Sequence, residues 1–375
     1  MKYRFQVLDI FRGLFASFVF LYHLSAFSQT AIINNGFVYN SDMFVDFFFV
    51  LSGFVIGYSY EHLASTKELG KFFKKRVLRI YPLHFVMLLA FLMMEVAKHL
   101  LANKIHVNNL HSENNLYTFI SSLFLLNSFP VFHVKDVSWN IPSWSISAEM
   151  AAYFIFGWLL LAINKPKFYK MRAVAYSIIL LLATFSFIYI TKGIKLNYTF
   201  DYGFLRGIIG FFTGLLCLLF FLRTKEFMFK VSGVFFSVAE TVALVLVCLS
   251  IYYGTLLKPV GLIYELIFFL CIYIFSFEKG FISGGMKKIK VLGKVGKYSY
   301  SIYMTHALLI SLFNVLFIRI LKFPPTAYSY LFILNYLLIY FVSSLTYKHI
   351  ELKFYSQKRS DKRILTTAAT DSYSN

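Results

Sequence analysis

The sequence predicts an all-α, polytopic membrane protein of about ten transmembrane helices, with both termini in the cytoplasm. Of its 375 residues, 59% are hydrophobic and only 14% are charged, whereas about a quarter of the residues in a soluble domain are charged. Apolar runs long enough to cross a bilayer as helices recur from one end of the chain to the other.

Eleven apolar segments stand out in a hydropathy window of about 19 residues. They cover residues 7–28, 43–60, 81–101, 116–132, 144–164, 172–191, 203–222, 234–254, 258–277, 299–321 and 328–348. Basic residues gather at the N-terminus, in 67–79, 165–172, 223–230 and 279–297, and in the C-terminal tail. Because cytoplasmic loops carry an excess of Lys and Arg, these segments are expected to face the cytoplasm.

The segment 116–132 is not expected to cross the membrane. The chain must cross an even number of times between the basic loops, and 81–101 and 144–164 already supply two crossings. Segment 116–132 is also short and has Pro130 near its end, so it is predicted to be re-entrant or interfacial, which leaves ten spans. We expect 1–355 to form one transmembrane domain and 356–375 a polar, disordered cytoplasmic tail.

The formal charge of +20 does not indicate a nucleic-acid partner. The basic residues flank the spans, and attraction to anionic headgroups of membrane lipid explains that distribution. Three cysteines, Cys217, Cys248 and Cys271, all lie in apolar segments. Their spacing predicts neither a disulfide framework nor a zinc site, and no metal is expected.

Arg12 and His23 both lie in the first apolar segment. Eleven residues turn an α-helix about 20° past three full turns and advance it about 16 Å, so both side chains share one face at different depths. A charged residue in a span usually faces a protein interior or a water-filled cavity. Singly, Arg12 can instead pair with Asp9 at the interface and His23 can be an ordinary interfacial histidine. Together on one face they favour a functional role.

Arg76 and Arg79 form an R-x-x-R one helical turn apart, just before the next span. Two guanidinium groups on one face suit the oxygens of a phosphorylated ligand. Spacing alone favours an ordinary cytoplasmic flank. Four lysines nearby make a phosphate site plausible under either interpretation: Lys67, Lys71, Lys74 and Lys75.

Other polar residues fall inside the spans. Glu149 and Asp46 lie near the outer ends of their predicted spans, with Glu149 level with His23. Each carboxylate can orient an imidazole, or can be a first-turn carboxylate that the helix dipole favours. Tyr303 and His306 lie at i,i+3 in the cytoplasmic half of a late span, where a buried, hydrogen-bonded pair is favoured. Glu240 and Glu265 are assigned no role. The chain has no G-x-S-x-G, Walker, H-E-x-x-H or dinucleotide motif, so hydrolase, ATPase and zinc-protease activities have no support.

Five motifs, taken in order, resemble the acyltransferase 3 family of integral-membrane acyltransferases, many of which O-acetylate bacterial surface polysaccharides. They are Asp9 with the R-x10-H of Arg12 and His23, VDFFFVLSGFVIG (45–57), KKRVLRIYPLH (74–84), WSISAEMAAYF (144–154) and GKYSYSIYMTH (296–306). The final motif differs from the family pattern. Tyr347 and Glu351 fit it, but Lys353 stands where a proline is expected. The extra periplasmic domain of some members is not expected here, so any activity is expected to reside in the membrane domain.

The resemblance implies an acyl-CoA donor, most often acetyl-CoA, a glycan hydroxyl as acceptor, and a multi-pass position in the bacterial cytoplasmic (inner) membrane. Arg12, Arg76 and Arg79 would bind the CoA phosphates, and Tyr303 and His306 are grouped with this cytoplasmic site. His23 would act as general base or acyl carrier, oriented by Glu149 and Asp46. The loop 102–143, with its polar residues His106, His111, Glu113 and Asp136, and its Trp139 and the following Trp144 are expected to line the acceptor site.

A transporter or flippase without covalent chemistry is the main alternative, because buried charges also line substrate pathways. It predicts polar stripes on several helices and an inverted repeat, and the sequence displays neither. A non-catalytic scaffold would leave R-x10-H and R-x-x-R without a purpose. Peptidoglycan, a lipid-linked glycan or a small molecule as acceptor, and succinyl or longer donors, stay open.

Overall fold

The computed structural model describes residues 4–60, 63, 65–101, 113–130, 136–163 and 171–354. These residues form helices and no strand, which confirms the all-α class. The long helices are α1 (Gln6–Ser25), α3 (Phe44–Ser59), α4 (Thr66–Leu101), α6 (Ser143–Ala162), α7 (Arg172–Thr191), α8 (Gly203–Met228), α9 (Gly233–Tyr252), α11 (Ile263–Phe275), α13 (Lys290–Asn314) and α15 (Phe332–Thr346). Shorter elements join them: α2 (Gly36–Tyr39), η1 (Ser41–Met43), α5 (Leu116–Leu123), α10 (Gly254–Leu257), η3 (Lys258–Val260), α12 (Phe281–Lys288), η4 (Val315–Ile320), α14 (Pro325–Ser329) and η5 (Tyr347–Glu351).

Among the described residues, eight helices are long and apolar enough to cross a membrane. A ninth span results if 254–260 and α11, which meet at 108°, are counted as one broken span. The remaining predicted span corresponds to α15, whose 15 residues rise about 22 Å against a hydrocarbon core of about 30 Å. The polytopic fold is therefore confirmed, while the count of ten and the side of the termini stay predictions.

In segment 116–132, the described residues 116–130 contain no helix long enough to cross a membrane. Its only described helix is α5, with eight residues and a length of about 12 Å. The hydroxyl side chains Thr118, Ser121 and Ser122 of α5 are buried, while Leu116 and Tyr117 are exposed. A helix with its polar face inward and its apolar face outward suits a membrane interface, as the sequence predicted.

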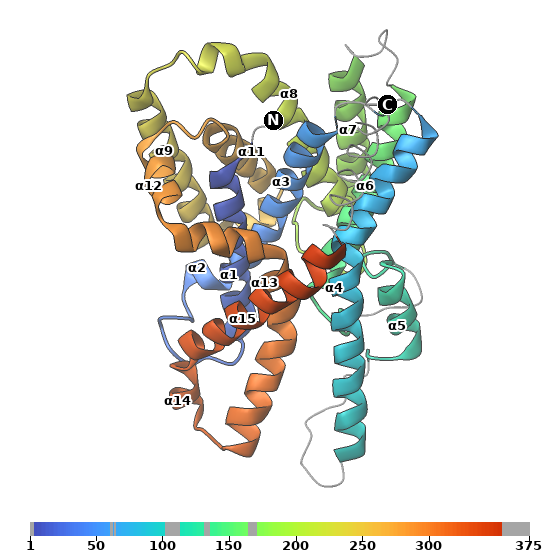
Figure 1. The fold of residues 1–375 in the computed structure, drawn as a ribbon, viewed down its shortest axis with the longest axis vertical. Helices are drawn as coiled ribbons and strands as arrows, with labels where there is room; N and C mark the ends of the chain where they lie inside the picture. Colours follow the sequence, from blue (N-terminus) through green and yellow to red (C-terminus); the bar gives the residue numbers. More distant parts are fainter. Residues whose placement is uncertain are drawn as a thin grey trace, which may run out of the picture.

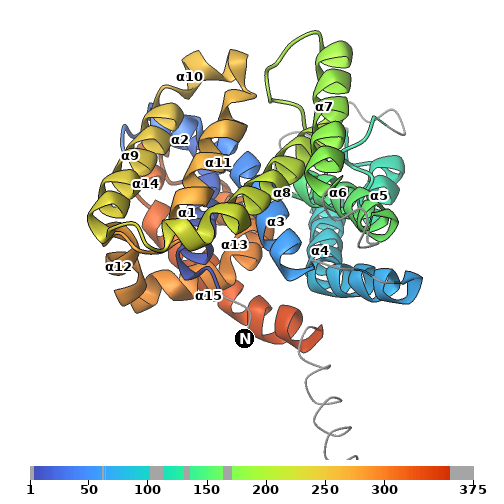
Figure 2. The same cartoon turned by 90° about the horizontal axis from the view of Figure 1, so that it is seen from above.

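The expected loop 67–79 is instead the first part of α4, which runs through 36 residues into the predicted span. Lys, Glu, Leu and Arg are strong helix formers, so this basic stretch has no reason to end the helix. The helix changes direction between its basic and apolar parts (Figures 1 and 2). Pro82 lies inside it, and a proline ring clashes with the carbonyl four residues earlier and kinks a helix.

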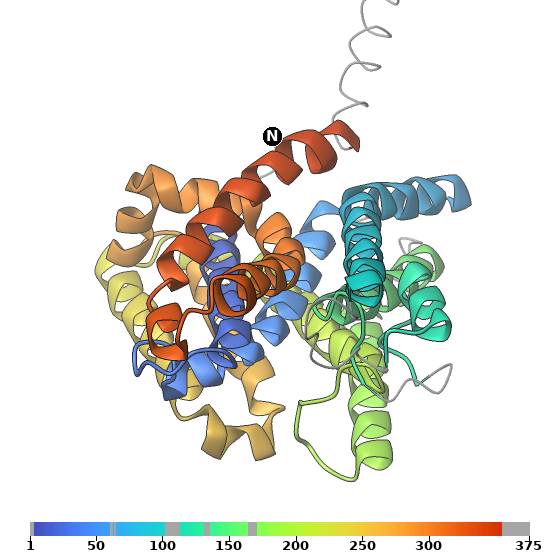
Figure 3. The same cartoon turned by 90° about the horizontal axis from the view of Figure 1, so that it is seen from below.

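The helices form two groups with α3 and α8 between them (Figure 1). One group contains α1, α9, α11, α12 and α13, and the other contains α4, α5, α6 and α7. Helices α3 and α8 are the most buried spans, whereas α7 and α9 lie at the periphery (Figures 2 and 3). Exposed apolar side chains such as Leu181, Phe185 and Val242 cover these outer helices, as contact with lipid tails requires.

Two glycines bring α1 and α13 into backbone contact. A Cβ atom added to Gly13 would lie 2.6 Å from the backbone nitrogen of Gly296, and one added to Gly296 would lie 2.5 Å from the carbonyl oxygen of Asp9. Small residues permit such close approach of membrane helices. This contact sets the relative position of every polar side chain farther along the two helices.

Candidate active site

Arg12 leaves the surface of α1 and reaches α13. Its Nε donates to the hydroxyl of Ser299 at 2.8 Å, and its Nη2 lies 3.1 Å from Asp9 Oδ1. The pairing with Asp9 considered from the sequence is therefore present. The bond to Ser299 adds a contact that an interfacial arginine would not have.

Arg79 of α4 lies within electrostatic range of Arg12 and of Glu351 in η5. Glu351 is buried and accepts a hydrogen bond from Ser301 of α13. Helices α1 and α4 and the element η5 thus meet at one place. The structure brings together two of the three arginines that the sequence grouped around phosphate.

Arg76 reaches a second polar group between α3, α4 and α6. Its guanidinium carbon lies 5.5 Å from the centre of the Tyr60 ring, and it contacts Tyr153. Glu149 accepts hydrogen bonds from Ser52 Oγ and Tyr153 Oη, each at 2.5 Å. Arg76 Nε is buried without a hydrogen-bond partner in the part of the chain described, so this donor is open to a ligand.

His23 lies beside a second histidine. The rings of His23 and His306 have their centres 5.1 Å apart, with a 34° angle between their planes. His23 is half-buried, while His306 is completely buried. Tyr303 packs against His306 at 5.8 Å, and its hydroxyl lies 2.9 Å from Ser145 Oγ. Tyr303 and His306 are thus both buried and in ring contact, but the Tyr303 hydroxyl bonds to Ser145 and not to His306, as the predicted hydrogen-bonded pair would require.

The location of His306 differs from the prediction. The sequence put it in the cytoplasmic half of its span, with the acyl-CoA site, but α13 begins at Lys290 rather than near 299. His306 therefore lies 16 residues into the helix, about 24 Å from its start. The structure places it level with His23 and away from Arg12.

Asp46 and Glu149 were expected to orient His23, and the structure differs. None of their hydrogen bonds within the described residues reaches His23. Glu149 is six residues, about 9 Å, into α6 and faces Ser52 of α3. Asp46 is occupied by Arg206 of α8, which donates from Nε at 2.5 Å and from Nη2 at 2.6 Å. Both members of this ion pair are buried.

Arg206 was not among the residues predicted from the sequence, although an arginine within GFLRGIIGFF is itself an intramembrane charge. Its guanidinium carbon lies 5.2 Å from the centre of the Trp144 ring. Trp144 is thus covered by a cation on one face. Trp139 is buried as well, and its indole nitrogen donates to Thr118 at 3.0 Å. Both tryptophans are therefore packed against other side chains of the protein. That they line the acceptor site stays a prediction.

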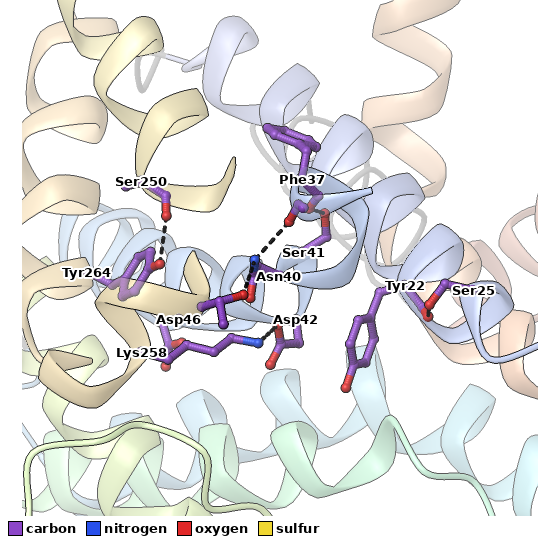
Figure 4. A network of polar contacts seen from close by, with 12 residues as sticks. Tyr22, Ser25, Phe37, Asn40, Ser41, Asp42, Asp46, Ser250, Lys258 and Tyr264 are labelled. Carbon is purple, nitrogen blue, oxygen red and sulfur yellow. Dashed lines mark hydrogen bonds and ion pairs between the residues drawn. The ribbon is translucent and has the colours of Figure 1, made fainter. Parts of the chain in front are cut away.

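A polar network holds the start of α3, where Asp46 lies (Figure 4). Lys258 forms an ion pair of 2.8 Å with Asp42, and Asn40 donates to the Gly36 carbonyl at 2.8 Å. Tyr264 donates to the Ser250 carbonyl at 2.8 Å and so joins α11 to α9. These contacts anchor η1 and the first turn of α3 to the broken span.

The remaining residues singled out from the sequence add no described contact to the candidate site. His106 and His111 lie outside the described residues, whereas Glu113 and Asp136 are described. Glu240 binds the start of α12, accepting from the backbone nitrogens of Gly280 and Ser283. Its role is structural. In the part of the chain described, no group of three His, Cys, Asp or Glu side chains is arranged to hold a metal ion.

Comparison with known proteins adds one finding. A family model described as "Acyltransferase domain", of the acyltransferase 3 type, matches residues 5–346 of the 375. No curated protein and no solved structure matches the chain. The matched range contains the helices α1 to α15 and every polar group described above except Glu351.

Proposed function

Because the chain belongs to the acyltransferase 3 family, and is thus a multi-pass membrane acyltransferase, we propose that it moves an acetyl group from cytosolic acetyl-CoA to a hydroxyl of a cell-surface or lipid-linked glycan. We further propose that it acts in the bacterial cytoplasmic membrane. The observation that carries the proposal is the pair of contacts between α1 and α13: Arg12 with Ser299 at one depth, and His23 with His306 about 16 Å farther along.

The donor's phosphates fit the arginine end of this arrangement. Arg12 and Arg79 come from different helices and converge, and Arg76 keeps an unpartnered Nε one turn from Arg79. A planar guanidinium donates two parallel hydrogen bonds to phosphate oxygens. The lysines at 67, 71, 74 and 75 on the same helix are exposed and add positive charge for a polyanion arriving from the cytosol.

The acyl group then lies at the histidine end. The distance from Arg12 to His23 is one that an extended pantetheine arm spans. His23 takes the proton of the acceptor hydroxyl, the oxygen bonds to the thioester carbon, and the carbon–sulfur bond breaks. The leaving thiolate receives the proton back from His23. Equally, His23 can accept the acyl group first and pass it to the hydroxyl in a second step.

One feature favours a transporter as the second candidate. The span formed by 254–260 and α11 is broken by a 108° bend, and Glu265 beyond the break is buried with both carboxylate oxygens unpartnered in the described chain. Broken helices and buried charges mark substrate sites in transporters. Transporters of this kind carry such breaks in corresponding halves, and the described residues contain one bent pair.

Membranes expressing the protein, incubated with radiolabelled acetyl-CoA and extracted cell-surface polysaccharide, provide the test. Wild type and His99→Ala, which alters an exposed histidine of α4, are expected to label the glycan. His23→Ala is expected to leave it unlabelled at equal expression. Full labelling by His23→Ala would rule out the mechanism, and no labelling by the wild type would favour the transporter.

A further inference from the structure

The imidazole of His306 has one nitrogen engaged and one nitrogen open. Its Nδ1 lies 3.3 Å from the carbonyl oxygen of Ile302, one turn earlier in α13. A carbonyl oxygen only accepts hydrogen bonds, so this contact puts the ring hydrogen on Nδ1 and a lone pair on Nε2. Nε2 is buried, and no donor reaches it from the residues that the structure describes.

A buried acceptor without a donor is unfavourable, which favours a role in which Nε2 accepts a hydrogen bond. The ring next to it is that of His23, at a centre-to-centre distance of 5.1 Å. Two ring nitrogens that face each other across this distance lie within hydrogen-bond range, and rotation of the His23 ring about χ2 turns one of its nitrogens toward Nε2 while the Ile302 contact holds the His306 ring. His23 is the more exposed of the two, so a substrate meets His23 first, with His306 behind it.

We propose, on the basis of the acyl-transfer function above, that His306 is a positioning residue that stabilises His23 when His23 carries a proton. As the hydroxyl O–H bond breaks, His23 gains a second N–H and a positive charge. One N–H of this imidazolium faces the reacting atoms, and His306 Nε2 accepts the other. Neutral His23 already carries the N–H that His306 accepts, so this bond precedes proton transfer and becomes stronger, as a charge-assisted bond, while His23 is an imidazolium. When the thiolate leaves and takes the proton, His23 is neutral again and the bond weakens.

The carboxylates expected in this role are committed elsewhere. Asp46 has both oxygens on Arg206, and Glu149 accepts from Ser52 and Tyr153. The ring neighbours described for His306 are His23 and Tyr303. An interaction that strengthens when His23 becomes charged stabilises the transition state more than the ground state, without tightening donor binding. Its loss should therefore lower the maximal rate and leave the apparent KM for acetyl-CoA unchanged.

Two substitutions separate this role from a structural one. In His306→Asn the side-chain amide can still donate to the Ile302 carbonyl, but nothing replaces Nε2. In His306→Gln the longer side chain places its amide oxygen near the Nε2 position and loses the Ile302 contact. We expect Asn to lower the maximal rate about 10²–10³-fold, as for other lost groups that stabilise developing charge, and Gln to recover most of it.

A structural role predicts the opposite order, with Asn more active than Gln. His84 supplies the matched control, because it is equally buried and has one ring nitrogen on a backbone carbonyl, Nε2 at 2.9 Å from that of Ser122. Its other nitrogen is likewise without a partner in the described chain, but its described ring neighbour is Tyr81 and not a second histidine. His84→Asn and His84→Gln should keep the wild-type maximal rate. All rates are measured as acetyl transfer from labelled acetyl-CoA to surface polysaccharide and normalised to folded protein by gel filtration and thermal unfolding in detergent.

The result that overturns the proposal is full activity in folded His306→Asn, or Asn and Gln variants equally impaired. Both results leave wild-type transfer intact, so the acyltransferase function would survive them. Absence of transfer by the wild type is a different result, which removes the proposed function itself.

Discussion

The guanidinium of Arg206 binds both carboxylate oxygens of Asp46, at 2.5 and 2.6 Å, between the two most buried helices of the protein. A third nitrogen, Nη1, reaches the Tyr198 carbonyl at 3.4 Å. The pair thus connects α3, α8 and the segment before α8. Asp46 therefore joins α3 to α8 and is not available to orient His23.

Arg206→Met is expected to destabilise the protein by about 3–5 kcal/mol, because it leaves the buried Asp46 carboxylate without its cation. The double variant Asp46→Leu/Arg206→Met should regain most of that loss, since apolar residues replace both charges. Thermal unfolding of the purified proteins in detergent measures both changes. A double variant as unstable as the single one would show that the pair is not the cause.

Gly296→Ala is expected to lower thermal stability and acyl transfer together. The added Cβ would lie 2.5 Å from the Asp9 carbonyl oxygen, so α1 and α13 must separate and His23 must move relative to His306. The control is Gly293→Ala in the same helix, where a Cβ meets no atom within 4 Å. That change should be neutral or stabilise by about 0.5–1 kcal/mol. Equal behaviour of the two variants would contradict the close contact.

Arg79→Ala is expected to raise the apparent KM for acetyl-CoA about 10–100-fold, the effect of losing one hydrogen bond to a charged group. The maximal rate should change little, because the phosphates are bound equally before and during the reaction. Initial rates at varied acetyl-CoA concentration measure both quantities. Met93→Ala, at an exposed residue of the same helix, should keep the wild-type KM, and an unchanged KM in Arg79→Ala would remove the arginine from the donor site.

Cysteine labelling tests the predicted orientation. In a variant with Cys217, Cys248 and Cys271 replaced by alanine, a membrane-impermeant maleimide should label Ile32→Cys in intact cells. It should label Phe281→Cys only after the membrane is opened. Both positions are well exposed, at 60% and 81%, so access to the reagent depends on the side of the membrane. Labelling of Phe281→Cys in intact cells would reverse the assignment.

Hydropathy and basic-residue placement were enough to predict the helical class and the non-spanning segment 116–132, because both depend on local composition. They failed at helix starts. The Lys-rich stretch before Ser299 looks like a loop by hydropathy, yet it is helical from Lys290. Since depth is counted from the helix start, this error moved His306 to the wrong end of its span.

Pairs between distant segments could not be predicted in the same way. The approach of His23 to His306 depends on how α1 and α13 pack, and the Asp46–Arg206 pair joins residues 160 positions apart. A stricter use of one rule would have helped, since any arginine inside an apolar run needs a buried partner. That rule points to Arg206 and an acid on a neighbouring helix.

The glycine contact between α1 and α13 also restricts how the chain tolerates insertions. Gly13 fixes the register of α1 against Gly296, and the nine residues between Gly13 and His23 carry the helix to His306. One residue added there would rotate His23 by about 100° and turn its ring away from its neighbour. In this interval the number of residues matters more than their identity. Deletion of a single residue would therefore be more damaging than the substitution of several.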